Sequence, residues 1–203
     1  SAFANPSADG KTWVATLAPK INIEDTSNTI AVGTGWTDLA GNAPTAGLTS
    51  GNYTIDTKAP TVSSIAIANT ALKRGESSPV TVTFSEAVSG FALDDVTYDT
   101  SSATLSAFTT SNNIVWTATL QATNDIEDTT NTLAIAASSY TDTAGNIGGG
   151  LVSANYAVET KRPVVSSLVL SDTALKKDET ATLTITFSEA VTAFDASDIT
   201  LTS

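Results

Sequence analysis

The chain has 203 residues and a formal net charge of −12, from 21 acidic and 9 basic side chains. It contains no His and no Cys, which excludes a Ser-His-Asp triad, a thiol nucleophile, zinc fingers, and the common haem and iron–sulfur ligands. The few Lys and Arg residues argue against nucleic acid as a partner, and the oxygen ligands that remain suit a hard cation such as Ca²⁺.

Five segments alternate apolar and small polar residues, which is the two-residue period of a half-buried β-strand. They are residues 63–68, 80–84, 113–121, 132–136 and 155–159. Thr, Val and Ile dominate these segments and favour a pleated sheet over a helix. Stretches rich in Gly, Asn, Asp and Ser lie between them at 72–78, 123–131 and 142–150, and we interpret these as turns and loops. The sequence therefore predicts an all-β fold.

The sequence also repeats itself at a spacing of 103 residues. NYTIDTKAP at 52–60 returns as NYAVETKRP at 155–163, and TVTFSEAV at 81–88 returns as TITFSEAV at 184–191. About seven short antiparallel strands per repeat predict tandem immunoglobulin-like β-sandwich domains with Greek-key topology. We expect one full repeat at 59–161, the second half of a repeat at 1–58, and the first half of another at 162–203. The expected core of the full repeat contains Phe84, Trp116, Leu120 and Ile135.

Acidic residues recur beside the two linkers that join these repeats. If the first strand runs away from the first linker, then Glu86, Asp95 and the loop holding Asp142 all fall at that linker. The upstream repeat brings Asp56 and the loop of Glu24 and Asp25 to the same place. The corresponding residues at the second linker are Glu127, Asp128 and Glu159, which face Glu189 and Asp198.

Carboxylates that converge at one junction repel one another unless a cation lies among them. Ca²⁺ accepts about 6–8 oxygen ligands in a loose geometry, so loops from two domains can satisfy it. We therefore take these acidic residues as candidate Ca²⁺ ligands. The alternative is that they are solvated loop charges that confer solubility, and the sequence carries no EF-hand or nonapeptide calcium motif.

The segments FSEAV at 84–88, TDTAGN at 141–146 and DTKAP at 56–60 together resemble the bacterial Ig-like repeats of giant biofilm-associated and RTX-type adhesins. The resemblance covers the whole chain. It implies secreted extender modules on the surface of a Gram-negative bacterium, rigidified by Ca²⁺ at their linkers. The ion-binding positions that it implies are Asp56, Glu86, Asp95 and Asp142, with Glu159, Glu189 and Asp198 at the second linker. That second linker departs from the pattern, because Glu159 replaces Asp and Arg162 replaces Ala.

Three classes of function compete. The first is a non-catalytic spacer, whose repeats each contact only their neighbours. The second is a carbohydrate- or protein-binding adhesion module, which needs exposed aromatic side chains. The third, a glycosidase with two catalytic carboxylates, is disfavoured because so small a unit should offer no deep pocket. Most aromatic residues occupy paired repeat positions that indicate a scaffold role: Trp13 with Trp116, Trp36 with Tyr140, and Tyr53 with Tyr156. Tyr98 has no such counterpart and stays a candidate contact.

The two half-repeats should expose apolar faces and unpaired strand edges. We expect residues 162–203 of one chain to pack with residues 1–58 of another, head to tail. The alternative is that the segment comes from a longer repetitive chain. The other expected partners are neighbouring repeats of the same protein. We also expect an extracellular location at the bacterial cell surface and no membrane insertion, because no stretch approaches roughly 20 consecutive apolar residues.

Overall fold

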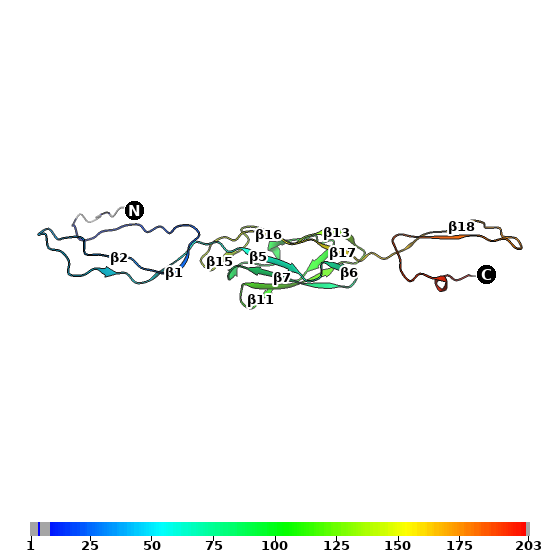
Figure 1. The fold of residues 1–203 in the computed structure, drawn as a ribbon, viewed down its shortest axis with the longest axis horizontal. Coiled ribbons are helices and arrows are strands. Elements are labelled where there is room, and N and C mark those ends of the chain that lie inside the picture. Colours follow the sequence, from blue (N-terminus) through cyan, green and yellow to red (C-terminus); the bar gives the residue numbers. More distant parts are fainter. Residues whose placement is uncertain (1–3, 5–8, 202–203) are drawn as a thin grey trace.

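The computed structural model describes residue 4 and residues 9–201. Figure 1 shows three bodies in a line, with a two-layered β-sandwich in the middle and an open arrangement of strands at each end. Among the described residues, no helix has the length and apolar character needed to cross a membrane.

The first layer of the middle repeat is an antiparallel sheet. Its strands, in spatial order, are β10 (Ala103–Leu105), β12 (Val115–Ala122), β7 (Ser77–Phe84) and β5 (Val62–Ile67), and β11 (Thr109–Thr110) also pairs with β12. Side chains along β7 alternate between buried and more exposed positions, as the two-residue period predicts. The expected strands at 63–68, 80–84 and 113–121 all lie on this layer.

The second layer is built from shorter strands. One of its sheets places β17 (Tyr156–Glu159) between β13 (Glu127–Asn131) and β6 (Ala71–Lys73), and the other places β14 (Ala134–Ile135) between β16 (Leu151–Val152) and β9 (Val96–Thr97). The interpretation of 123–131 as a loop is wrong for 127–131, which form β13. The sequence EDTTN has no apolar alternation, and it is extended because it pairs with β17 in an antiparallel ladder.

The hydrophobic core lies between the two layers. Phe84, Leu120 and Ile135 are buried in it, as expected from the sequence. Trp116 is only partly buried and packs edge-on against Phe91, with 5.3 Å between ring centroids. The 3₁₀ turn η1 (Leu93–Asp95) and a short pairing of β8 (Val88–Ser89) with β15 (Thr141–Asp142) complete the connections.

The end bodies repeat parts of this sandwich. At the N-terminal end, β1 (Glu24–Asn28) pairs with β4 (Tyr53–Asp56), and β2 (Ala31–Val32) pairs with β3 (Leu48–Thr49). The C-terminal body contains β18 (Val165–Leu170) paired with β19 (Leu183–Phe187), followed by η2 (Ala196–Asp198). The register Glu24↔Asp56 corresponds to Glu127↔Glu159 in the middle repeat, so equivalent segments of the two repeats form the same ladder. The predicted all-β, tandem Ig-like fold is confirmed, but the strands are not all antiparallel as predicted, because β6 pairs with β17 in the parallel direction.

Candidate metal centre

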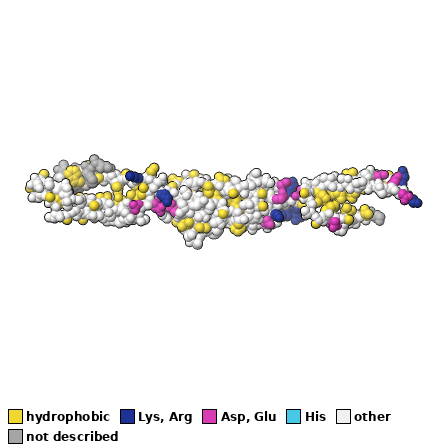
Figure 2. Space-filling view, viewed as in Figure 1, with side chains coloured by type: hydrophobic (Ala, Val, Ile, Leu, Met, Phe, Trp, Pro, Cys, Tyr) yellow, Lys and Arg dark blue, Asp and Glu magenta, His cyan; other side chains and the backbone are white. Residues whose placement is uncertain are grey.

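Three carboxylates meet where the first end body joins the middle repeat. Asp56 is the last residue of β4, Glu86 follows β7, and Asp142 is the last residue of β15. One carboxylate oxygen from each lies within 4.8 Å of the other two. Asp142 is buried, while Asp56 and Glu86 are half-buried. Figure 2 shows acidic and basic side chains gathered at the two junctions, with few on the body of the middle repeat.

The segment after β15 fixes the Asp142 carboxylate within its own loop. The backbone N–H groups of Ala144 and Asn146 donate to Asp142 Oδ1 at 2.8 and 2.9 Å, and the Asn146 side chain donates to Oδ2 at 2.8 Å. Gly145 has a φ of 89°, a left-handed conformation that favours glycine. The TDTAGN motif is thus a turn that holds one carboxylate in a fixed orientation.

Asn146 also reaches across the linker to the preceding body. Its side-chain nitrogen donates to Asp56 Oδ1 at 3.3 Å and to the Asp56 carbonyl oxygen at 3.4 Å. A single amide therefore contacts two of the three carboxylates and connects the two bodies. Asp56 lies 90 residues from Asn146 in the sequence, whereas Asp142 lies four residues from it. Only the folded structure therefore shows that Asn146 connects the two carboxylates.

The junction holds more negative than positive charge. Burial raises the pKa of Glu86, and the charges of Asp142, Asp56 and Glu24 raise it further. Burial alone would raise the pKa of Asp142. Hydrogen bonds from the Asn146 side chain and from backbone N–H groups outweigh this effect, so the pKa of Asp142 is lowered. Lys58 is the nearby cation, and its ammonium group forms an ion pair with Glu24 at 2.9 Å. That hydrogen bond raises the Lys58 pKa, with smaller contributions from Glu86 and Asp56.

The donor set fits a hard divalent cation. Three carboxylates supply up to six oxygens from two bodies, and Ca²⁺ tolerates such irregular arrangements. No donor among the described residues hydrogen-bonds to the Glu86 carboxylate, so its oxygens are free to coordinate an ion. A bound cation would offset the repulsion that raises the Glu86 pKa.

The other acidic residues predicted at this junction lie outside the group of three carboxylates and have other partners. Asp95 accepts a hydrogen bond from the Ala92 backbone N–H at 2.7 Å and closes the turn of η1. Asp25 accepts one from the Ser27 N–H at 3.0 Å within β1. Glu24 lies opposite Asp56 in the ladder but forms the ion pair with Lys58. The structure therefore groups three of the six residues that the sequence suggested.

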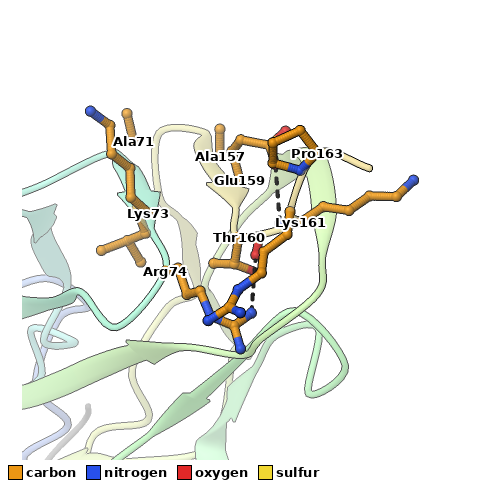
Figure 3. A pocket seen from close by; sticks show the side chains of 10 residues that line it. Ala71, Lys73, Arg74, Ala157, Glu159, Thr160, Lys161 and Pro163 are labelled. Atoms are coloured by element: carbon orange, nitrogen blue, oxygen red, sulfur yellow. Dashed lines mark hydrogen bonds between the residues drawn. The ribbon is translucent and has the colours of Figure 1, made fainter. Parts of the chain in front are cut away.

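The second junction has a different electrostatic character. A groove of about 340 Å³ lies between β6, the end of β17 and the linker that follows. Figure 3 shows the side chains that line it. Four of its lining residues are basic: Lys73, Arg74, Lys161 and Arg162. Arg74 pairs with Asp125 at 2.9 Å and Lys161 with Glu127 at 3.4 Å. Protein cations thus balance acidic groups at the second junction.

The remaining predicted residues at the second junction are dispersed. Glu159 accepts a hydrogen bond from the Lys161 N–H at 3.2 Å, and Asp198 accepts one from the Asp195 N–H at 3.0 Å in η2. Glu189 is exposed after β19. Asp128 lies on β13, where hydrogen bonds from the Thr130 N–H and the Ser102 hydroxyl lower its pKa. The residues that the structure describes at this junction form no group of three carboxylates like that at the first.

Tyr98, the unpaired aromatic residue, is part of the scaffold. Its ring packs against the hydrophobic core, and its hydroxyl accepts a hydrogen bond from the Leu105 N–H at 3.3 Å. This arrangement offers no exposed aromatic platform at residue 98 for a sugar.

Comparison with known proteins agrees with the repeated fold. The sequence model of a family described as bacterial Ig-like domain matches three consecutive segments, residues 1–55, 56–158 and 159–203. No curated protein and no solved structure matches the chain. Together, the matched segments cover the whole sequence and agree with its 103-residue repeat. The chain therefore belongs to the family of bacterial Ig-like domains.

Proposed function

We propose that this chain is a non-catalytic extender segment of a large bacterial cell-surface adhesin, in which Ca²⁺ rigidifies the junction between repeats. The observation that carries the proposal is the meeting of Asp56, Glu86 and Asp142 within 4.8 Å at the first junction. The tandem Ig-like family supports a structural or adhesive role. An array of such repeats gains reach by repetition, because each unit contacts only its neighbours.

The cation would act as a cross-link between two bodies. Asp56 belongs to the strand that enters the linker, whereas Glu86 and Asp142 belong to the repeat that follows it. Among the residues that the structure describes, the hydrogen bonds across this linker are the long ones from Asn146 to Asp56. Binding an ion to all three carboxylates would restrict bending of the linker. Rigid junctions would hold an adhesive tip away from the cell surface.

Calcium titration of the 203-residue chain tests this proposal. Titration calorimetry should show saturable binding, and small-angle scattering should show a longer, less flexible particle in millimolar calcium than in EGTA. Scattering profiles and calorimetric traces that are identical in the two conditions would contradict the proposal.

Matched variants test whether the ion binds at the first junction. Asp56→Asn and Asp142→Asn should abolish the calcium effect on scattering. Asp94→Asn removes the same charge from an exposed residue outside the carboxylate group and should preserve the effect. If Asp94→Asn weakened binding as much as Asp56→Asn, the ion would be responding to overall negative charge and not to this site.

A further inference from the structure

We propose that the middle repeat contains a second cation site, separate from the first junction, at which Asp99, Asp128 and the hydroxyl of Tyr156 bind one Ca²⁺ ion. All three residues belong to the complete repeat at 59–161. The inference does not rest on the calcium site proposed at the first junction.

Two carboxylates approach each other at one edge of the sandwich. Asp99 lies in the loop that leads into β10, an edge strand of the first layer. Asp128 lies on β13, an edge strand of the second layer, opposite Val158 of β17. The Ser102 hydroxyl connects the two, because its oxygen is 3.1 Å from Asp99 Oδ2 and 3.0 Å from Asp128 Oδ2. The site thus lies beside β13 and β17, both labelled in Figure 1.

The shared hydroxyl is too few donors for two carboxylates. Ser102 has one hydroxyl hydrogen, so it can donate to only one of the two Oδ2 atoms at a time. Each Oδ1 is already used in a local turn, where the Ser101 N–H donates to Asp99 at 2.8 Å and the Thr130 N–H donates to Asp128 at 2.9 Å. No ion pair among the described residues includes either carboxylate.

Both carboxylates are charged at neutral pH. Hydrogen bonds from Ser101 and Ser102 lower the pKa of Asp99. Hydrogen bonds from Thr130 and Ser102 also lower the pKa of Asp128, although burial and the nearby charge of Asp99 act in the opposite direction. Two like charges separated by a single hydroxyl repel each other unless a cation lies among them.

A buried hydroxyl without a partner is the second observation that indicates a ligand here. Tyr156 is fully buried, and its hydroxyl oxygen has no hydrogen-bond partner among the described residues. This oxygen lies near both carboxylates, because the charges of Asp99 and Asp128 add to the effect of burial and raise the pKa of Tyr156. Leaving a buried polar group without a partner is costly, so a water molecule or an ion is expected beside it.

The chemistry of these donors favours a hard divalent cation. The group consists of oxygens alone, from two carboxylates and from the hydroxyls of Ser102 and Tyr156. Ca²⁺ accepts about 6–8 oxygen ligands in a loose geometry, and water can supply the remaining ones because Asp99 is exposed. A water molecule could satisfy the Tyr156 hydroxyl, but it would not neutralise two negative charges. The bound ion would join the loop at 99–102 to β13 and so connect the two layers at this edge.

The site would stabilise the middle repeat itself and not a junction. In the following repeat, Thr202 stands at the position that corresponds to Asp99, 103 residues later. That repeat therefore lacks one of the two carboxylates. Asp99→Thr gives the middle repeat the residue of its neighbour, so it is a substitution that the fold should accept.

Metal titrations of the Asp56→Asn chain test the proposal. This variant removes one ligand of the first-junction group without changing the middle repeat, because Asp56 lies on β4. The probe is Tb³⁺, which binds oxygen ligands as Ca²⁺ does and luminesces when an adjacent tyrosine is excited. Saturable luminescence that excess calcium displaces is expected. Adding Asp99→Asn or Asp128→Asn should weaken the affinity by about tenfold or more, because Ca²⁺ affinity depends on the number of charged ligands.

Tyr156→Phe gives a readout of the hydroxyl. In the Asp56→Asn chain it should reduce the terbium luminescence, since it removes the tyrosine at the site. In calcium it should lower the melting temperature, whereas in metal-free buffer at neutral pH it should not. Luminescence and calcium stabilisation that are unchanged in Tyr156→Phe would overturn the proposal.

Asp94→Asn is the matched control for charge. Asp94 is an exposed acidic residue of the same repeat, and its substitution in the Asp56→Asn chain should leave the affinity unchanged. If Asp94→Asn weakened binding as much as Asp99→Asn, the ion would respond to overall charge and the proposal would be refuted. Melting curves in EGTA show whether each variant folds, and Asp99→Thr replaces Asp99→Asn if the latter does not.

Calorimetric titration of the unmodified chain with calcium separates this site from the first junction. Two ions per chain, one lost with Asp56→Asn and the other with Asp99→Asn, would support both proposals. One ion that is lost only with Asp99→Asn would support this inference and contradict the junction site. One ion that is lost only with Asp56→Asn would overturn this inference and leave the proposed function standing.

Discussion

Glu86→Gln should stabilise the middle repeat in EGTA and destabilise it in calcium. In EGTA, the substitution removes one of three negative charges whose oxygens lie within 4.8 Å of one another. A pair of unit charges at that distance repels by about 0.9 kcal/mol in water and by about 3.5 kcal/mol at an effective dielectric constant of about 20. Glu86 has two such neighbours but is half-buried, so the lower end of this range applies. We expect Glu86→Gln to stabilise the middle repeat by about 1–2 kcal/mol in EGTA.

In saturating calcium, the same substitution should destabilise the middle repeat. A ligand present at about 100 times its dissociation constant stabilises the folded state by about 2.7 kcal/mol, and a neutral amide at residue 86 weakens that binding. Differential scanning calorimetry measures both effects, with about 4 °C expected per kcal/mol for a domain of this size. The melting temperature of Glu86→Gln should lie above that of the unmodified chain in EGTA and below it in calcium. A variant that is less stable in both buffers would refute the electrostatic reasoning.

Three further predictions concern the middle repeat. Thr160→Val should cost about 1–3 kcal/mol of unfolding free energy, because the Thr160 hydroxyl donates to the Thr123 carbonyl at 2.7 Å and accepts from the Ile126 N–H at 2.9 Å. Thr160→Ser keeps these hydrogen bonds, so its unfolding free energy, measured by urea denaturation, should fall much less. Trp116→Ala should cost about 3 kcal/mol, since the ring packs against Phe91 but is partly exposed, and unchanged thermal stability would contradict its place in the core. Burial and the charges of Asp99 and Asp128 raise the pKa of Tyr156 to about 12. The neutral phenol therefore contributes stability that is fully present below the ordinary pKa of 10.0 and is lost as the pH rises through about 12. Tyr156→Phe should remove this alkaline loss of stability. It should not lower stability at pH 7, because the hydroxyl has no hydrogen-bond partner among the described residues. Unfolding curves measured at a series of pH values test this, and a variant with the same alkaline loss as the unmodified chain would contradict the reasoning.

Sequence patterns located most of the first sheet because its strands are long and face a core on one side. In β7 and β12, alternate residues are buried, so the two-residue period is visible in the sequence itself. The strand β13 escaped this reasoning because its residues, EDTTN, resemble a turn. Its extended conformation depends on the hydrogen-bonded ladder with β17, which begins 25 residues later. Such a strand is determined by its tertiary partner and not by its own composition.

The same contrast holds for the carboxylates at the first junction. Strand alternation was enough to bring Asp56, Glu86 and Asp142 to one end of the middle repeat. It did not distinguish them from Asp95, whose carboxylate closes the η1 turn, or from Glu24, which pairs with Lys58. The choice among such partners depends on differences of a few ångströms, which a pattern of residue types does not contain.

The sequence by itself determined the 103-residue repeat, the all-β character, and the ends of the repeat at which acidic residues collect, because periodicity and composition are local properties. Only the tertiary structure decided which three carboxylates meet, since that follows from the register of strands far apart in the chain. It also decided that Asn146 spans the first junction and that basic residues balance acidic ones at the second.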